Sequence, residues 1–345
     1  MAALTASDIA DIVAGVLRDL GPMKFQNIAS TIQYCEIFSR WFKKDKVTFE
    51  SGRGIQKNLL NRLNTAAARH VGLMDSDAVS NIDVMDQLTV DWVHAETHWV
   101  LIYQTDILMN SGKSSIVDTI KMKRASSLIA FVEMLEEKAW GSPPSSSNKV
   151  LPWGLKYWVV TNATEGFNGG APSGHTTVGG VSLTDSPNFK NYTAQYTTAN
   201  KTDLVSKMRT AKRKIRFVNP ISIPEYTSMA KDRYRIYCNE ETLKAFEDVG
   251  EGQNENLGRD IASMDGQTVF QNVPMIWISE LDDDTADPVY MIDHSSFYPV
   301  CLRGDYLRES EARQHPTQRN VYQTFLNLTY NYVDVDRRKN AVISK

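Results

Sequence analysis

The chain is poor in cysteine and has no long apolar run. Its three cysteines, Cys35, Cys238 and Cys301, lie far apart and form no C-x-x-C pair. This spacing argues against a disulfide framework and a cysteine zinc site, and it favours a reducing compartment. No stretch approaches the roughly 20 apolar residues of a membrane-spanning helix. The first residues also lack a basic start followed by an apolar run, so we expect no signal peptide and synthesis in a cytosol.

The overall composition is not extreme either. The 345 residues are 42% apolar and 23% charged, which is ordinary for a soluble globular protein. This length suggests roughly two domains. The formal net charge of −3 predicts no global attraction to nucleic acid or to an acidic membrane surface. Any such attraction must come from local patches.

The most unusual charge distribution lies in residues 47–106. Residues 51–74 contain bases and no acid, whereas residues 75–106 contain acids and no base. The four bases are Arg53, Lys57, Arg62 and Arg69. The seven acids are Asp75, Asp77, Asp83, Asp86, Asp91, Glu96 and Asp106. Residues 88–104 alternate in polarity and are rich in Val, Trp and Thr, so they predict a strand. The simplest architecture is a long hairpin with one basic and one acidic leg, and with too few large apolar residues for its own core.

Three segments carry apolar residues at helical spacing. Residues 9–20 predict an N-terminal amphipathic helix. Residues 114–139 predict a longer helix, capped at Ser115 and Asp118, which at about 1.5 Å per residue could form a structural axis. Residues 204–215 predict a third helix whose other faces are basic.

The second half of the chain also contains short apolar segments that predict strands. They are LKYWVV (155–160), RYRIYC (233–238), VPMIWI (273–278), PVYMID (288–293) and VYQTFLNLTYNYVDVD (321–336). The last one alternates over many residues and would suit a sheet shared by two parts of the fold. Residues 161–200 are rich in Gly, Ser, Thr and Asn, which predicts an irregular loop.

A glycine-rich stretch within this loop imitates a nucleotide site. The segment Gly169–Thr176 matches the pattern G-x-x-x-x-G-K-[ST] except that His175 replaces the lysine. No helical pattern follows to supply aligned N–H groups. A second fragment, SGKSS at 111–115, lacks the first glycine. We therefore expect Gly169, Gly170 and Gly174 to serve a flexible connection, and a nucleotide-binding enzyme remains a remote alternative.

Three other segments imitate ligand sites. HAETH (94–98) resembles a zinc helix, but its flanks predict a strand, in which residues four apart are separated by about 13 Å. SELDDDTADP (279–288) is acidic, yet a solvated hairpin turn explains it better than a cation site. The basic helix near 202–216 could meet phosphates, although we favour acids of a neighbouring subunit as its partner. The residues assemble no nucleophile, base and orienting group, so we predict no catalytic, cofactor or metal site.

The order of these elements resembles the major capsid proteins of tailed bacteriophages that have the Hong Kong ninety-seven type fold. The likeness extends over nearly the whole chain, and its specificity lies in the order and spacing of segments. These segments are KVTFESGRGIQ, ARHVGL, YWVVTNATEGFNGG, RFVNPISIPEY, DRYRIYCN, NENLGRDIASMDGQTVFQNVPMIWI, DPVYMID, GDYLRE and LTYNYVDVDRRKNAVISK.

The resemblance implies an α+β fold with four parts. They are an N-terminal arm (1–45), an extended β-hairpin loop (46–112), a peripheral domain (113–160 and 301–345) with a spine helix at 114–139, and an axial domain drawn mainly from 161–300. In that family the extended loop lies over an adjacent subunit, and the axial domains meet at the centres of pentamers and hexamers.

The resemblance also implies a function. We expect a major capsid protein, located in the virion and assembled in the bacterial host cytoplasm, that forms pentamers and hexamers around double-stranded DNA. The DNA contact would be non-specific, separate scaffolding and portal proteins would assist, and no membrane would be involved. An encapsulin-like nanocompartment is the alternative. Because the arm begins almost at Met1, we expect a separate scaffold rather than a cleaved leader. The residues of the subunit crosslink known in some members find no match here.

The charged hairpin legs are our candidates for inter-subunit contacts. Opposite charges on a protruding hairpin can pair across its strands or with complementary patches on neighbours. The predicted contact residues are Arg53, Lys57, Arg62, Arg69, Asp75, Asp77, Asp83 and Asp86.

Overall fold

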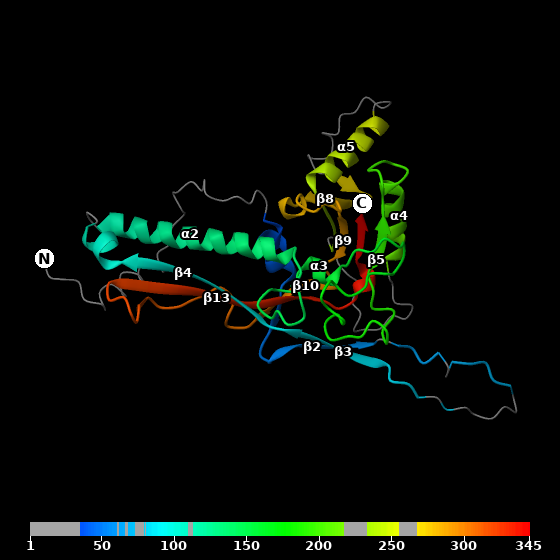
Figure 1. Cartoon of the computed structure of the whole chain (residues 1–345), viewed down its shortest axis with the longest axis horizontal. Coiled ribbons are helices and arrows are strands. Elements are labelled where there is room, and N and C mark those ends of the chain that lie inside the picture. Colours follow the sequence, from blue (N-terminus) through cyan, green and yellow to red (C-terminus); the bar gives the residue numbers. More distant parts are fainter. Residues whose placement is uncertain are drawn as a thin grey trace.

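The computed structural model describes residues 35–60, 62–65, 68–72, 79, 81–109, 113–216, 233–254 and 268–345. These residues form two six-stranded sheets, one two-stranded ribbon and a small set of helices (Figure 1). The predicted N-terminal helix at 9–20 lies outside the described residues.

The first sheet is built around one long strand. Strand β13 pairs with β10, β4, β11 and β12, and β1 pairs with β10. The strands are β1 (Val47–Phe49), β4 (Val93–Ile102), β10 (Phe297–Leu302), β11 (Arg308–Glu309), β12 (Arg313–Gln314) and β13 (Val321–Asp334). The ten-residue antiparallel pairing of β4 with β13 is its longest ladder. The predicted strand at 321–336 is thus confirmed.

Helix α2 (Lys113–Ala139) runs along one face of this sheet (Figure 1). Alternate residues of β4, such as Trp99 and Leu101, are buried beneath it, where Trp99 and Leu101 form a cluster with Ile120 of α2. Near the other end of the helix, the side chains of Phe131 and Leu135 are buried in the main hydrophobic core. The predicted long helix is confirmed. The predicted cap at Ser115 and Asp118 is wrong, because the helix already begins at Lys113.

The second sheet has a different layer on each face. Its pairing order is β5-β14-β9-β6-β8-β7. The strands are β5 (Tyr192–Gln195), β6 (Tyr234–Cys238), β7 (Val269–Phe270), β8 (Val273–Trp277), β9 (Val289–Asp293) and β14 (Ala341–Ser344). Helices α4 (Leu204–Lys214) and α5 (Glu240–Asn254) cover one face, where Ile236 and Cys238 are buried. On the other face, Tyr237 packs in the core that contains Leu135 of α2.

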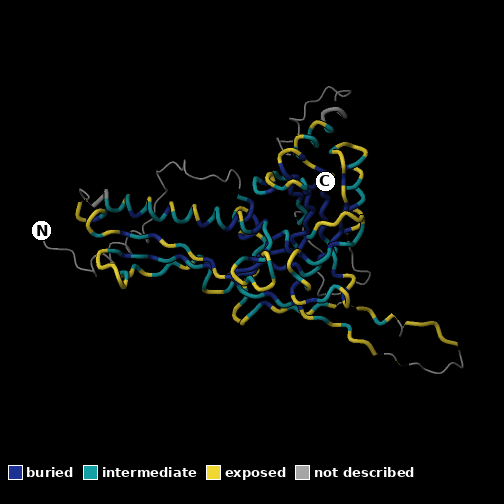
Figure 2. The backbone as a smooth tube through the Cα atoms, in the orientation of Figure 1, coloured by how far each residue is buried: buried dark blue, intermediate teal, exposed yellow. Residues whose placement is uncertain are grey.

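Strands β2 (Gly54–Leu60) and β3 (Met85–Asp91) form an antiparallel ribbon that projects away from both sheets (Figure 1). Its base is packed, with Ile55, Leu88 and Val90 fully buried. Beyond the base the described residues are mostly exposed (Figure 2).

The predicted hairpin is therefore confirmed for β2 and β3 only. The chain leaves the ribbon after Asp91, and residues 93–102 join the first sheet as β4. The acid Glu96 consequently belongs to the sheet and not to the ribbon. Sequence alternation alone could not locate this break, because both strands have the same two-residue period.

Two other local predictions are wrong. LKYWVV contains the short helix α3 (Leu155–Trp158), since a short apolar run does not distinguish a strand from a buried helical turn. The acidic segment 279–288 is not a hairpin turn. Strands β8 and β9 both pair with β6, which lies between them, so the segment crosses over β6 and begins with the 3₁₀ turn η5 (Ser279–Leu281).

The described residues also form three other short helices. They are η1 (Ile37–Asp45), η2 (Tyr103–Leu108) and η6 (Arg337–Lys339). The turn η6 joins β13 of the first sheet to β14 of the second. Residues 301–345, expected in one peripheral domain, thus supply strands to both sheets.

Candidate functional site

The ribbon, taken from here on as β2, β3 and the described residues between them, carries an unusual concentration of exposed apolar side chains. Among the described residues, six of the thirteen large apolar side chains that are exposed lie between positions 60 and 85. They are Leu60 (63% exposed), Leu63 (71%), Val71 (58%), Val79 (96%), Ile82 (37%) and Met85 (65%). Leu60 and Met85 are direct cross-strand partners. An apolar surface on a projecting element is typical of an interaction site.

The base of the ribbon is held by the body of the same chain. Lys57 donates to the hydroxyl of Tyr298 and lies 5.0 Å from its ring centroid. The Thr89 amide donates to the Gly179 carbonyl at 2.8 Å. These contacts fix the direction in which the ribbon leaves the body.

The predicted charged contact residues fall into three groups. Lys57, Arg62 and Asp86 make contacts within the chain: Arg62 Nε donates to the Asp185 carbonyl at 2.9 Å, and Ser186 Oγ donates to Asp86 at 3.1 Å. The second group comprises Arg53, Arg69 and Asp83, which are exposed. Asp75 and Asp77 lie outside the described residues.

The ribbon thus has two kinds of candidate contact residue. The inter-subunit role of the charged residues remains a prediction. The exposed apolar residues were not predicted from the sequence. The signal that could have identified them is that Leu60, Leu63 and Val71 stand in a polar segment without the period of a buried helix or strand face.

A second feature is a buried polar junction between η1 and α2. The backbone amides of Glu36 and Ile37 donate to the two carboxylate oxygens of Glu136 at 3.2 and 2.9 Å. Trp140 Nε1 donates to the same carboxylate at 3.3 Å. Glu136 therefore supplies acceptors for amides at the start of η1, which would otherwise lack intrahelical partners.

The junction extends into the second sheet through Tyr237. The Tyr237 hydroxyl donates to Glu36 at 3.1 Å and accepts from Trp41 Nε1 at 3.0 Å. It also lies 2.7 Å from His294 Nε2. All of these side chains are buried. The start of the described chain, the long helix and the second sheet are thereby joined by one polar network.

Burial raises the pKa of the Glu136 carboxyl from 4.5 to about 7. An acid whose pKa is raised on folding stabilises the folded state below the pKa of the unfolded chain, and this stabilisation is lost as the pH rises through the folded value. We expect the free energy of unfolding to fall between about pH 4.5 and 7, by up to roughly 3 kcal/mol from this group. Glu136→Gln should flatten this dependence, measured by urea unfolding at pH 5 to 8.

Glu137→Gln is the matched control, because Glu137 is the adjacent residue of the same helix and its side chain is 61% exposed. This variant should keep the wild-type pH dependence. Asp334 is a second buried acid whose pKa is raised to about 7, chiefly by burial, so Glu136→Gln removes only part of the slope. An unchanged slope in Glu136→Gln would contradict the role given to this carboxyl.

The glycine-rich stretch has the predicted irregular structure, and no helix follows it up to Lys190. The predicted role as a flexible connection is wrong for Gly169 and Gly174. A Cβ atom at Gly169 would lie 1.8 Å from the Asn191 side chain. At Gly174, φ is +77° and a Cβ would lie 2.2 Å from the Pro144 carbonyl oxygen. Both positions require glycine because the backbone is closely packed there.

One buried arginine organises this loop. Arg337 is fully buried and donates to three backbone carbonyls, those of Trp158 (2.6 Å), Phe189 (3.1 Å) and Gly170 (2.9 Å). It also donates to Asn191 Oδ1 at 3.0 Å. The surroundings of Gly169–Thr176 are therefore those of a packed structural element. Sequence reasoning missed Arg337, which stands in an ordinary basic run.

The two histidines of HAETH lie on β4, so their predicted strand conformation is confirmed. His94 Nδ1 lies 2.8 Å from Thr329 Oγ1, and the His98 ring lies 5.8 Å from the Phe325 ring. Within the described part of the chain, no three His, Cys, Asp or Glu residues are grouped as metal ligands would be. The Lys113–Ser115 part of the SGKSS fragment begins α2, and its first two residues are outside the described ranges.

Three acids of segment 279–288, Asp282, Asp284 and Asp287, have partners on other elements of the chain. Asp282 accepts from Trp277 Nε1 at 2.9 Å and from the Glu240 amide, at the start of α5, at 2.8 Å. Asp284 forms an ion pair with Lys156 at 2.8 Å.

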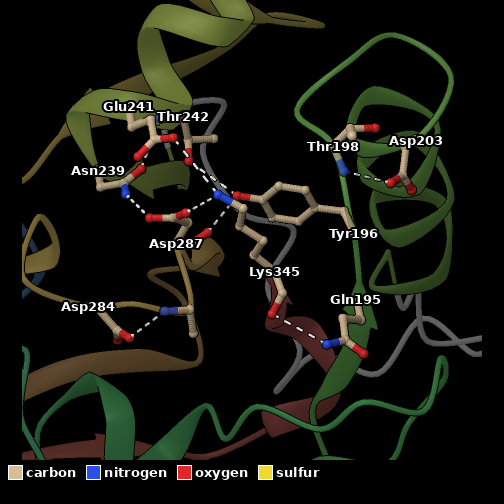
Figure 3. A network of polar contacts seen from close by, with 11 residues as sticks. Gln195, Tyr196, Thr198, Asp203, Asn239, Glu241, Thr242, Asp284, Asp287 and Lys345 are labelled. Atoms are coloured by element: carbon tan, nitrogen blue, oxygen red, sulfur yellow. Dashed lines mark hydrogen bonds and ion pairs between the residues drawn. The ribbon is translucent and has the colours of Figure 1, made fainter.

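Asp287 belongs to a network beside the last strand (Figure 3). Its carboxylate accepts from Asn239 at 2.6 Å and from Lys345 at 3.0 Å, while its carbonyl accepts from the Tyr196 hydroxyl. This network ties β14 to the start of α5.

The described part of the chain contains no helix long and apolar enough to cross a membrane.

Comparisons with known proteins give structural matches alone. No family model matches the chain, and no curated protein matches it by sequence. The capsid of cyanophage A-1(L) has a TM-score of 0.62 at 11% identity, with 94% of this chain and 96% of that chain covered. The capsid of the native GTA particle has a TM-score of 0.57 at 10% identity, with 99% of both chains covered. The holo-SrpI encapsulin complex of Synechococcus elongatus PCC 7942 has a TM-score of 0.54 at 11% identity, covering 96% and 94%.

The chain therefore has the α+β fold of the subunits in these capsids and this encapsulin complex. Capsids of other phages, including Gordonia phage Cozz, match over similar lengths. This is the Hong Kong ninety-seven type fold that the sequence resemblance implied, and the predicted fold is confirmed.

Proposed function

We propose that this protein is a major capsid protein that assembles into pentamers and hexamers and forms an icosahedral shell around phage double-stranded DNA. The observation that carries the proposal is the projecting ribbon, whose six exposed apolar side chains have no described surface of their own chain to cover them. A two-stranded ribbon is marginally stable in water, so it gains most from a surface on another molecule. The fold shared with capsid subunits makes another copy of the chain the natural partner.

In this proposal the parts of the chain have separate roles. The first sheet with α2 is the peripheral domain, and the second sheet with α4 and α5 is the axial domain, which lies at the centre of each ring. The ribbon lies over the adjacent subunit. The N-terminal arm is the part expected at 1–45, of which Ile37–Asp45 forms η1 against the core. The role is structural and needs no catalytic group.

The proposed partners beyond other copies follow from the same reading. Packaged DNA would be contacted without sequence specificity, because phosphate contacts need only cationic side chains. Separate scaffolding and portal proteins would guide assembly in the bacterial cytoplasm, and the finished protein would reside in the virion.

Electron microscopy of the overexpressed full chain tests the proposal. We expect closed particles of uniform size, together with a fast-sedimenting species in analytical ultracentrifugation. A protein that stays monomeric at every concentration and salt tested would contradict it.

The contents of the particles separate the two shell functions. The fold shared with the SrpI encapsulin complex also supports the encapsulin alternative. Particles from the native source should contain double-stranded DNA if the protein is a capsid protein, and a protein cargo if it is an encapsulin.

A further inference from the structure

Helix α4 presents an excess of positive charge on the surface of the second sheet. We define its basic face as Arg209, Arg213, Lys214 and Arg216. The last three are exposed, and Arg209 is half-buried. Within the part of the chain that the structure describes, Asp203 is the one acid that forms an ion pair with α4, and its partner is Lys207 at 2.7 Å. The basic face therefore lacks a described acidic counterpart on its own subunit.

The positive charges on and beside this helix repel one another. The buried Lys212 donates to the Gln271 carbonyl at 2.6 Å. Burial, followed by the nearby Arg216 charge, lowers its pKa to about 8. An acidic surface placed against the basic face would relieve this repulsion.

Helix α5 covers the same sheet face but does not provide that surface. Its first acids have other partners, since Glu240 pairs with Lys244 at 2.5 Å and Glu241 lies 3.8 Å from Lys345. Glu247 accepts from Thr268.

An acidic surface is formed by the end of α2 and the segment that follows β8. We define this acidic face as Glu137, Glu280, Asp282 and Asp283. Burial raises the pKa of Glu280, and the nearby charges of Glu137, Asp283 and Asp282 raise it further, so these four carboxylates lie close enough to repel one another. Asp282 and Asp283 are exposed.

The alternation of the strands places α4 and the end of α2 on opposite faces of the sheet, while Asp282 lies beside the start of α5. Residues Ile236 and Cys238 of β6 pack with the apolar side of α4. The residue between them, Tyr237, is buried in the other core cluster, which also contains Leu135 of α2 and Leu281 of the acidic segment. Side chains of neighbouring strand residues point to opposite faces of a sheet.

We propose that the basic face of α4 contacts the acidic face of the next copy of this chain around each ring. A surface and its complement on different parts of one subunit favour head-to-tail contact, which closes into a ring when the rotation fits. Such complementarity fixes orientation and speeds encounter more than it adds affinity. The inference rests on the proposed function and identifies the charged contact within its rings.

Charge reversal on each face, followed by a charge swap, tests this contact. One variant carries Arg213→Glu, Lys214→Glu and Arg216→Glu. A second carries Glu137→Lys, Glu280→Lys and Asp283→Lys, which leaves Asp282 to cap α5. The third combines all six changes and restores the wild-type net charge.

We expect each single-face variant to reduce the assembled fraction by at least about tenfold in sedimentation velocity at physiological salt. The combined variant should recover particles, because the three exchanged charges on each face are again opposite in sign to those on the other. Wild-type assembly should also weaken as added salt screens the contact. Unfolding midpoints establish that each variant is folded, and glutamine replacements serve where a reversed variant is not.

The other outcomes are equally informative. Normal particles from a folded single-face variant, or a folded combined variant that fails to assemble, would overturn the inference. Normal particles that hold less DNA when only α4 is reversed would instead assign the basic face to nucleic acid. If the wild-type chain forms no particles, the proposed function fails; if wild type and variants assemble alike, only this inference fails.

Discussion

Replacing Arg337 with methionine is expected to destabilise the protein by roughly 3–5 kcal/mol, the cost of removing one partner from a buried charged network. The change leaves three backbone carbonyls without this donor, those of Trp158, Phe189 and Gly170. The Asn191 Oδ1 atom also loses Arg337 and keeps only the Val160 amide as its donor. It also removes the positive charge nearest to the buried Asp334 carboxyl. Since whole proteins are stable by only about 5–15 kcal/mol, much of the variant should be insoluble. Chemical unfolding of the soluble fraction measures the loss.

Arg338→Met is the matched control. Arg338 is the adjacent residue, its side chain is 38% exposed, and it pairs with Asp336 at 3.1 Å. Its replacement should cost at most about 1 kcal/mol, as is typical of exposed ion pairs. Arg337→Lys should fall between the two, because an ammonium group keeps the charge but cannot reach all four acceptors. Equal unfolding midpoints for Arg337→Met and Arg338→Met would show that the network does not stabilise the fold.

Replacing the exposed apolar side chains of the ribbon is expected to abolish shell formation and leave the subunit folded. The variant combines Leu60→Ser, Leu63→Ser and Met85→Ser. Each of these side chains is more than 60% exposed in the free subunit, so the free energy of unfolding should change little. If a neighbouring subunit covers them, each contributes about 1.5–3 kcal/mol to assembly. The loss of all three should leave no particles in electron microscopy.

Two controls separate this effect from others. Val150→Ser alters a side chain that is 77% exposed outside the ribbon, so it should assemble normally. The pair Arg53→Glu and Arg69→Glu alters charge on the ribbon, and we expect a smaller, salt-dependent defect, because exposed ion pairs contribute about 0–1 kcal/mol each. Lys57 and Arg62 are omitted because they contact Tyr298 and Asp185 of their own chain. Normal particles from the triple serine variant would exclude the ribbon as an apolar assembly contact.

The two candidate contact sets differ in how far the sequence could predict them. The charge division of residues 51–106 was visible in the sequence, and so was the presence of a hairpin. The sequence did not show where these charges act. In the structure, Lys57, Arg62 and Asp86 hold the ribbon to the body of the same chain. The junction of Glu36, Glu136 and Tyr237 joins residues up to 201 positions apart, and no local pattern reports such a contact.

Local physical chemistry was sufficient for elements with a strong period of their own. The helix Lys113–Ala139 and the strand Val321–Asp334 follow from apolar spacing, because each buries one face over many residues. The sequence alone thus determined the α+β class, the long helix and the absence of a helix directly after His175, up to Lys190.

Only the tertiary structure decided how these elements combine. It separated β4 from the ribbon, placed β6 between β8 and β9, and converted the glycine-rich stretch into a packed support for Arg337. These outcomes depend on which distant surfaces bury each other and satisfy each other's polar groups. The sequence specifies which side chains are available for such contacts. Which of them contact one another is decided only when the whole chain folds.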